Sequence, residues 1–123
     1  MHGAVGTRYA AAVRMIEVIL DPDRVDPVKE ALGLIGVRGM TVSEVKGGSA
    51  GSGNTSLYRG SRYAVSRSRI RLEIVVDDGF ADAVVRRILV AANRERPSDG
   101  TIAVLPMLDV IRIRTGERGP DAL

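Results

Sequence analysis

Two arginines near the end of the chain, Arg112 and Arg114 in the stretch "VIRIRTGERGPDAL", could bind phosphate groups. They are two residues apart, and in an extended segment such side chains project from the same side. Guanidinium groups hold phosphate oxygens by charge-assisted hydrogen bonds, so the pair could hold a di- or triphosphate. The pair could equally be the solvated face of an edge strand, and the spacing alone leaves both interpretations open.

Five further arginines crowd into the middle of the chain, and no acidic residue interrupts them between positions 59 and 71. They are Arg59, Arg62, Arg67, Arg69 and Arg71. Such a cluster can be ordinary solvated charge, an RNA-binding patch or a docking surface for an acidic protein. Only 3% of the residues are aromatic, which leaves few platforms on which bases could stack. We therefore favour an acidic protein partner and expect no nucleic acid.

The residues that most catalytic and metal sites need are missing. The chain has no cysteine, and its one histidine, His2, lies at the terminus. No serine–histidine pair, paired acids or Gly-rich loop followed by Lys-Ser or Lys-Thr appears at a telling spacing. No apolar run approaches the roughly 18 residues of a membrane span. The sequence predicts a cytoplasmic protein that is not an enzyme, with no metal, no tightly bound cofactor and no membrane insertion.

The elements that would position these arginines follow from the periodicity of apolar residues. Strands are predicted at residues 15–20, 40–45, 70–76 and 101–107, helices at 23–36 and 77–93, and an extended or edge segment at 109–114. The first helix would have Asp23 as its N-cap and Gly36 as its C-terminal stop. Residues 1–14 show no period, so we expect a disordered N-terminal extension before a single domain at 15–123.

This order predicts an α+β fold, a ferredoxin-like β-α-β-β-α-β sandwich with two helices on one face of an antiparallel sheet. On strand 70–76 the apolar residues alternate with Arg71, Glu73 and Val75, so the second face is mixed and self-association could cover it. About 20 residues join the second and third strands, where hairpin loops usually have about 2 to 5. Their stretch "GGSAGSGNTSLYRGSRY" is typical of a mobile recognition loop.

The stretches "GMTVSEVKG", "LYRGSRY", "RLEIVVDD" and "VIRIRTGERGPDAL" resemble the PII signal-transduction family, the trimeric nucleotide-binding sensors of nitrogen and carbon status. The resemblance covers residues 15–123 in the right order. It implies a homotrimer with nucleotide sites at the subunit boundaries. It also implies that the long insertion, at about residues 48–69, is the T-loop that docks into partner proteins.

By this resemblance the ligand is an adenine nucleotide. Arg112 and Arg114 match the phosphate-binding arginines of the family, and Asp99 and Gly100 match the end of its phosphate loop. The family's next residue is a lysine, whereas this chain has Thr101. The positions that line the adenine and ribose cleft are Ile19, Thr41, Gly47, Glu73 and Val75.

Three departures from the family pattern bear on the ligand. Thr101 removes one phosphate cation, unless Arg94 or Arg96 replaces it. The family's glutamine that binds magnesium and 2-oxoglutarate falls on Gly51, and its lysine at the far end of the loop falls at or beside Arg69. We therefore expect ADP or AMP to bind at least as tightly as ATP, and magnesium with 2-oxoglutarate to add little.

The expected function is a regulator whose nucleotide occupancy sets the conformation of the T-loop. Arg59, Arg62 and Arg67 would bind an acidic partner, a membrane transporter or a metabolic enzyme, and Tyr63 matches a tyrosine that some members carry as a modification site. We also expect residues 48–67 to be mobile in the free protein. Three alternatives stay open: a ligand-independent adaptor, a sensor of inorganic carbon, ADP or AMP, and an acylphosphatase-like enzyme on the same fold.

Overall fold

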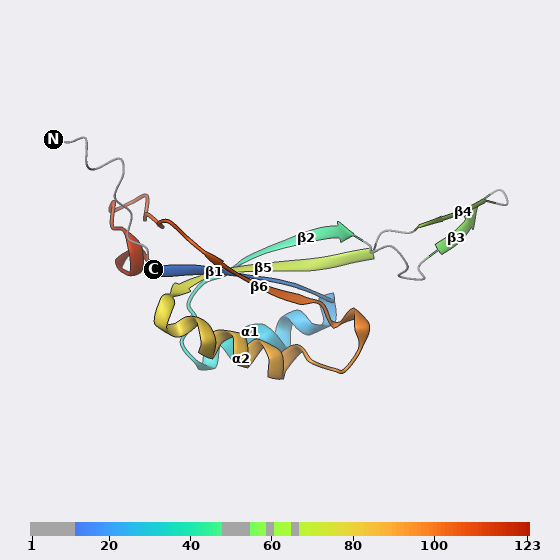
Figure 1. Ribbon diagram of the computed structural model, residues 1–123, viewed down its shortest axis with the longest axis horizontal. Helices are drawn as coiled ribbons and strands as arrows, with labels where there is room; N and C mark the ends of the chain where they lie inside the picture. Colours follow the sequence, from blue (N-terminus) through green and yellow to red (C-terminus); the bar gives the residue numbers. More distant parts are fainter. Residues whose placement is uncertain (1–11, 48–54, 59–60, 65–66) are drawn as a thin grey trace.

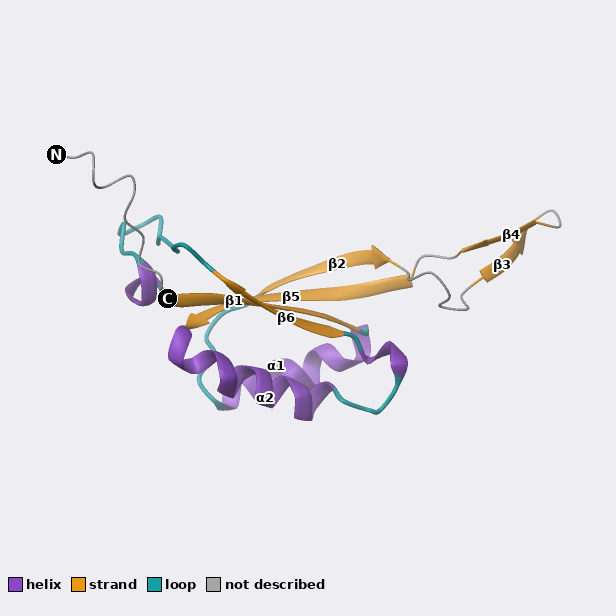
Figure 2. Cartoon of the chain, viewed as in Figure 1, coloured by secondary structure: helices purple, strands orange, loops and turns teal. Residues whose placement is uncertain are grey.

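The computed structural model describes residues 12–47, 55–58, 61–64 and 67–123. Its main sheet has four antiparallel strands in the order β2-β5-β1-β6. These are β1 (Val13–Leu20), β2 (Thr41–Gly47), β5 (Arg67–Asp77) and β6 (Thr101–Pro106). Helices α1 (Val25–Leu34) and α2 (Ala81–Ala92) cover one face of the sheet (Figures 1 and 2). The predicted β-α-β-β-α-β sandwich is confirmed.

The core lies between this sheet and the two helices. Alternate residues of β5, Leu72, Ile74 and Val76, are at most 5% exposed, as the period of two predicts. The helices contribute apolar residues at helical spacing, as predicted. The residues that form the core are Ile16, Val18, Leu20, Val28, Leu32, Leu72, Ile74, Val76, Ala81, Val84 and Ile88. Because the helices cover one face of the sheet, the side chains on the opposite face are available for binding.

The first strand begins at Val13, two residues before the predicted start of the domain. Val13 is 1% exposed, and the amide of Asp78 donates to the carbonyl of Ala12 at 2.8 Å. Arg14 hid this start because it interrupts the apolar run. Its side chain is about half exposed and forms an ion pair with Asp78.

The start of α1 also differs from the prediction. A short 3-10 turn, Pro22–Arg24, precedes α1, and the carboxylate of Asp23 does not cap it. That carboxylate instead accepts a hydrogen bond from Arg94, 71 residues away in sequence. The predicted end is confirmed: Gly36 has a φ of 95°, in the left-handed region that favours glycine.

The insertion joins edge strand β2 to the central strand β5. Part of it pairs as a hairpin of β3 (Thr55–Tyr58) and β4 (Ser61–Ala64), outside the main sheet (Figure 1). No strand was predicted within the insertion, and these eight paired positions correct that prediction. Arg62 and Tyr63 lie on β4, opposite Leu57 and Ser56. Arg59, the Gly51 stretch and the N-terminal residues 1–11 lie outside the described residues, as does most of the segment expected to be mobile.

Among the described residues, none of the helices is both long enough and apolar enough to span a membrane.

Candidate functional site

One face of the main sheet carries no helix (Figure 2). Because side chains alternate along a strand, the odd-numbered residues of β1 and β5 point toward this face. Ile19 pairs with Arg71 on one side and with Thr101 on the other. Arg71 pairs in turn with Ser43, whose Oγ accepts a hydrogen bond from Arg71 Nε at 3.3 Å. Ile19 and Thr101 thus lie side by side on the face that the helices leave open.

The loop of residues 93–100, between α2 and β6, is organised around the carboxylate of Asp99. Asp99 Oδ2 accepts hydrogen bonds from the amides of Arg94 at 2.6 Å and Arg96 at 3.1 Å. These two amides, followed by the side chain of Arg94, hold the pKa of Asp99 below its ordinary value, although partial burial opposes the shift. Asp99 therefore fixes the shape of the loop with its own charge.

Gly100 lets this loop approach β1 very closely. Its φ is 114°, which disfavours any residue with a side chain. A Cβ at this position would stand 1.8 Å from the carbonyl oxygen of Ile19. The backbone at Gly100 is therefore pressed against the end of β1, directly before Thr101.

Beside this loop, three arginines converge on one buried carboxylate. Asp21 is 8% exposed and directly follows β1. Its Oδ2 lies 3.0 Å from Arg94 Nη2, and its Oδ1 lies 3.1 Å from Arg67 Nη2 and 3.4 Å from Arg69 Nε. We call these four residues the Asp21 cluster. It connects the first residues of β5, where the insertion ends, to the loop of residues 93–100.

Arg94 contacts more carboxylates than its position in the sequence indicates. Besides Asp21, it contacts Asp23 at 2.8 Å and Asp99 at 3.2 Å. Its guanidinium is thus committed to three carboxylates and is not a free replacement for the family's phosphate-loop lysine. Arg96, the other predicted replacement, is exposed.

No acidic residue lies between the five central arginines in the sequence, but in the structure acidic side chains lie beside three of them. Arg67 and Arg69 contact Asp21, and Arg71 Nε lies 3.7 Å from Glu73 Oε1. Arg67, predicted to bind a partner, therefore has an internal counter-ion. Arg69 has one as well, and the sequence could not show this because Asp21 is 48 residues away.

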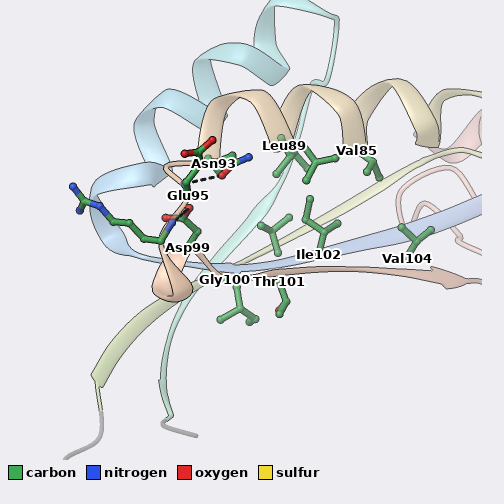
Figure 3. Close-up of a pocket in the computed structure, with 14 residues that line it drawn as sticks. Val85, Leu89, Asn93, Glu95, Asp99, Gly100, Thr101, Ile102 and Val104 are labelled. Atoms are coloured by element: carbon green, nitrogen blue, oxygen red, sulfur yellow. Dashed lines mark hydrogen bonds between the residues drawn. The ribbon is translucent and has the colours of Figure 1, made fainter. Parts of the chain in front are cut away.

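Two grooves lie at opposite edges of the main sheet. The first, about 510 Å³, runs between α2 and edge strand β6 and combines apolar residues such as Leu89 and Val104 with Asp99, Gly100 and Thr101 (Figure 3). The second, about 590 Å³, lies on the side of edge strand β2. It includes three of the predicted cleft residues together with the C-terminal residue. These four are Thr41, Glu73, Val75 and Leu123.

The predicted extended segment at residues 109–114 is wrong beyond Ile111. Ile111 forms an isolated bridge with Arg118, and residues 113–115 form a turn in which the amide of Gly116 donates to the carbonyl of Arg112 at 2.7 Å. Arg112 and Arg114 therefore do not project from one strand face. Both are exposed, and neither forms an ion pair within the described part of the chain.

Asp109 holds this C-terminal turn together. Its side chain is 5% exposed, and its carboxylate accepts hydrogen bonds from Arg118 Nε at 2.6 Å and from the amides of Val110 and Gly119. Burial raises the pKa of Asp109, but these three donors outweigh burial and leave the pKa below its ordinary value. The hydrogen bonds to Asp109 thus hold the turn that carries Arg112 in place.

Comparison with known proteins identifies the family. The family described as "Nitrogen regulatory protein P-II" matches residues 13–117. The chain belongs to the P-II family. Proteins named nitrogen regulatory protein P-II from Azospirillum brasilense and Rhizobium meliloti are 42% and 45% identical to it over 112 residues, which is 90% of this chain and 100% of each relative. The crystal structure of Arabidopsis thaliana PII bound to citrate is similar, with a TM-score of 0.75, 36% identity and coverage of 92% of this chain and 94% of that one.

P-II proteins are signalling regulators rather than enzymes, and in this member all of the predicted ligand residues except Gly47 fall in three places. Ile19, Asp99, Gly100 and Thr101 meet at the first groove. The residues of the second groove lie at the other edge of the sheet. The C-terminal turn with its two arginines is the third place, and Figure 1 shows the C-terminal segment at the end of the sheet away from the insertion. Gly47 ends β2, opposite Arg67.

Sequence reasoning missed the residues that hold the P-II loops in shape. In the sequence Asp21 only precedes Pro22, as a residue of a turn does, and no motif includes Asp109 or Arg118. The hint for the last two was charge complementarity at a spacing of nine residues around the "RIR" stretch. No comparable signal marked Asp21, because each of its partners is distant in sequence.

Proposed function

We propose that this chain is an adenine-nucleotide-binding P-II signalling protein that regulates a partner protein through its insertion. The observation that carries the proposal is the division of the predicted ligand residues between two grooves at opposite sheet edges. One groove offers Ile19 and the glycine loop, and the other offers Thr41, Glu73 and Val75. Each groove alone is half of the nucleotide site that the sequence predicts.

Two copies of the chain would complete the site. The β6 edge of one copy, with Gly100, would face the β2 edge of its neighbour, to which Arg112 and Arg114 would add phosphate contacts. A homotrimer closes this arrangement with three equivalent boundaries. The related plant protein holds citrate, an anion with three carboxylates, which supports an anion-binding role for this fold.

Calorimetric titration tests the proposal. ATP, ADP or AMP should bind at one site per chain, and light scattering should report a trimer of the 13.1 kDa chain. ADP or AMP should bind at least as tightly as ATP, because Thr101 lacks the lysine charge. Absence of heat with all three nucleotides would instead support the ligand-independent adaptor.

The partner would carry acidic groups that pair with Arg59 and Arg62, and its binding should weaken with added salt. Arg67 would contribute less than the sequence indicates, because Asp21 already neutralises it. A membrane transporter and a metabolic enzyme are the two partner classes, and modification of Tyr63 would act on the same hairpin. Pull-down with an Arg59→Ala/Arg62→Ala variant at two salt concentrations tests this role.

A further inference from the structure

The loop of residues 93–100, whose end matches the family's phosphate loop, carries little free positive charge where its backbone meets β1. Gly100 and Thr101 carry none, and Arg94 is committed to Asp21, Asp23 and Asp99. Arg96 lines the groove beside α2 and is exposed. A nucleotide phosphate at Gly100 would therefore need a cation from another element.

Arg69 of β5 is the cation that lies at this point. Its Nη2 donates to the carbonyl of Ser98 at 2.8 Å and stands 3.2 Å from the position that a Cβ on Gly100 would occupy. The strand alternation places Arg69 on the same sheet face as Ile19 and Thr101. Its side chain is 17% exposed, so it is held inside the structure and still reaches solvent.

The hydrogen bonds of Arg69 are incomplete. Its Nε lies 3.4 Å from Asp21 Oδ1 without the geometry of a hydrogen bond, and this buried nitrogen has no acceptor within the described residues. A guanidinium has five donors, and buried donors are normally all paired. Nε lies on the Asp21 side of the guanidinium, whereas Nη2 is the donor beside Gly100 from which an oxygen-rich anion could accept.

We propose that Arg69 binds phosphates that ADP and ATP share and offsets part of the charge that Thr101 lacks, with Asp21 as its positioning residue. This inference rests on the proposed nucleotide function and names a contact within it. Arg69 is the third residue of β5, directly after the insertion. A ligand that engages Arg69 therefore also acts on the start of β5, where the insertion returns to the sheet, and this contact couples ligand binding to the insertion.

Calorimetry with ATP, ADP and adenosine on the full chain tests the assignment, using Arg69→Gln and the matched control Arg67→Gln. Arg67 also pairs with Asp21, but among the described residues its hydrogen bond goes to Asp21 alone. Arg69→Gln should weaken ATP and ADP about tenfold or more and leave adenosine unchanged, because one charged hydrogen-bond donor to phosphate is lost. Arg67→Gln should leave all three affinities within about twofold.

Two more variants complete the experiment. Arg69→Lys keeps the charge beside Asp21, so it should fold and retain part of the ATP affinity. Arg96→Gln, which removes a charge from the same groove, should weaken ATP less than Arg69→Gln does. Equal ATP affinity in wild type and Arg69→Gln, a loss that adenosine shares, or a loss found in Arg96→Gln instead would each overturn the assignment. Wild type that binds none of ATP, ADP and AMP would overturn the proposed function itself, and that result is known before any variant is tested.

Discussion

Replacing Asp21 by Asn should destabilise the fold far more than the same change at Asp23. Asp21→Asn keeps the shape of the side chain and removes the charge that three arginines share. Asp23 also contacts Arg94, at 2.8 Å, but its side chain is 67% exposed against 11% for Asp21. The pair of variants therefore compares a sheltered ion cluster with a surface pair that has the same arginine as partner.

The expected losses in the free energy of unfolding follow from how far the side chains of each ion pair are exposed. Removing one partner of a buried pair costs about 3–5 kcal/mol, because the remaining charge is left uncompensated. Arg67, at 40% exposure, can turn toward water, so we expect about 2–3 kcal/mol for Asp21→Asn. An exposed pair is worth about 0–1 kcal/mol, which is the range for Asp23→Asn.

Urea unfolding measures both values at one protein concentration, because oligomer stability depends on concentration. Asp21→Asn should shift the midpoint well below that of Asp23→Asn, with little effect of added salt because the cluster is shielded. Equal midpoints for the two variants would refute the interpretation that Asp21 organises the base of the insertion.

Three other predictions concern the loops and the ligand. Gly100→Ala should lower the melting temperature by several degrees and weaken nucleotide binding, because its Cβ would meet the carbonyl of Ile19; an unchanged protein would show that the loop does not approach β1 so closely. Native Asp109 binds its proton less tightly than the unfolded chain does, so its contribution to stability should persist above about pH 5 and be lost as the pH falls below about 4. Acid unfolding of Asp109→Asn should lack this component, and identical pH profiles would contradict it. Finally, magnesium with 2-oxoglutarate should change the ATP affinity less than about tenfold in calorimetry, and a larger gain would show that Gly51 and Arg69 do not impair that site.

The fold was predictable because its apolar periods are regular. The alternation on β5 and the helical spacing through Val28, Leu32, Val84 and Ile88 determine which faces are buried, and these faces permit one layered arrangement. The start of β1 was not predicted because Arg14, a charged and exposed residue, stands where the alternation would place an apolar one. Local composition cannot distinguish that situation from the end of an element.

The candidate site was predictable as a set of residues but not as an arrangement. Alternating Arg112 and Arg114 indicate a strand, yet Asp109 and Gly116 fold the segment back into a turn. Arg67 and Arg69 look free because Asp21 lies in another part of the sequence. Ion pairs between distant residues depend on the finished fold, and no local pattern encodes them.

Mixing two defective variants tests the central claim, a nucleotide site shared between neighbouring copies, most directly. Thr101→Glu adds a repelling charge to the loop half, and Arg112→Ala/Arg114→Ala removes the cations of the other half, so each variant alone should bind no ATP. Trimers formed from equal amounts of the two after unfolding and refolding together should regain ATP binding at about a quarter of the boundaries, those that combine the intact half of each variant. No recovery in mixed trimers, with both variants folded and assembled, would contradict a site built from two copies.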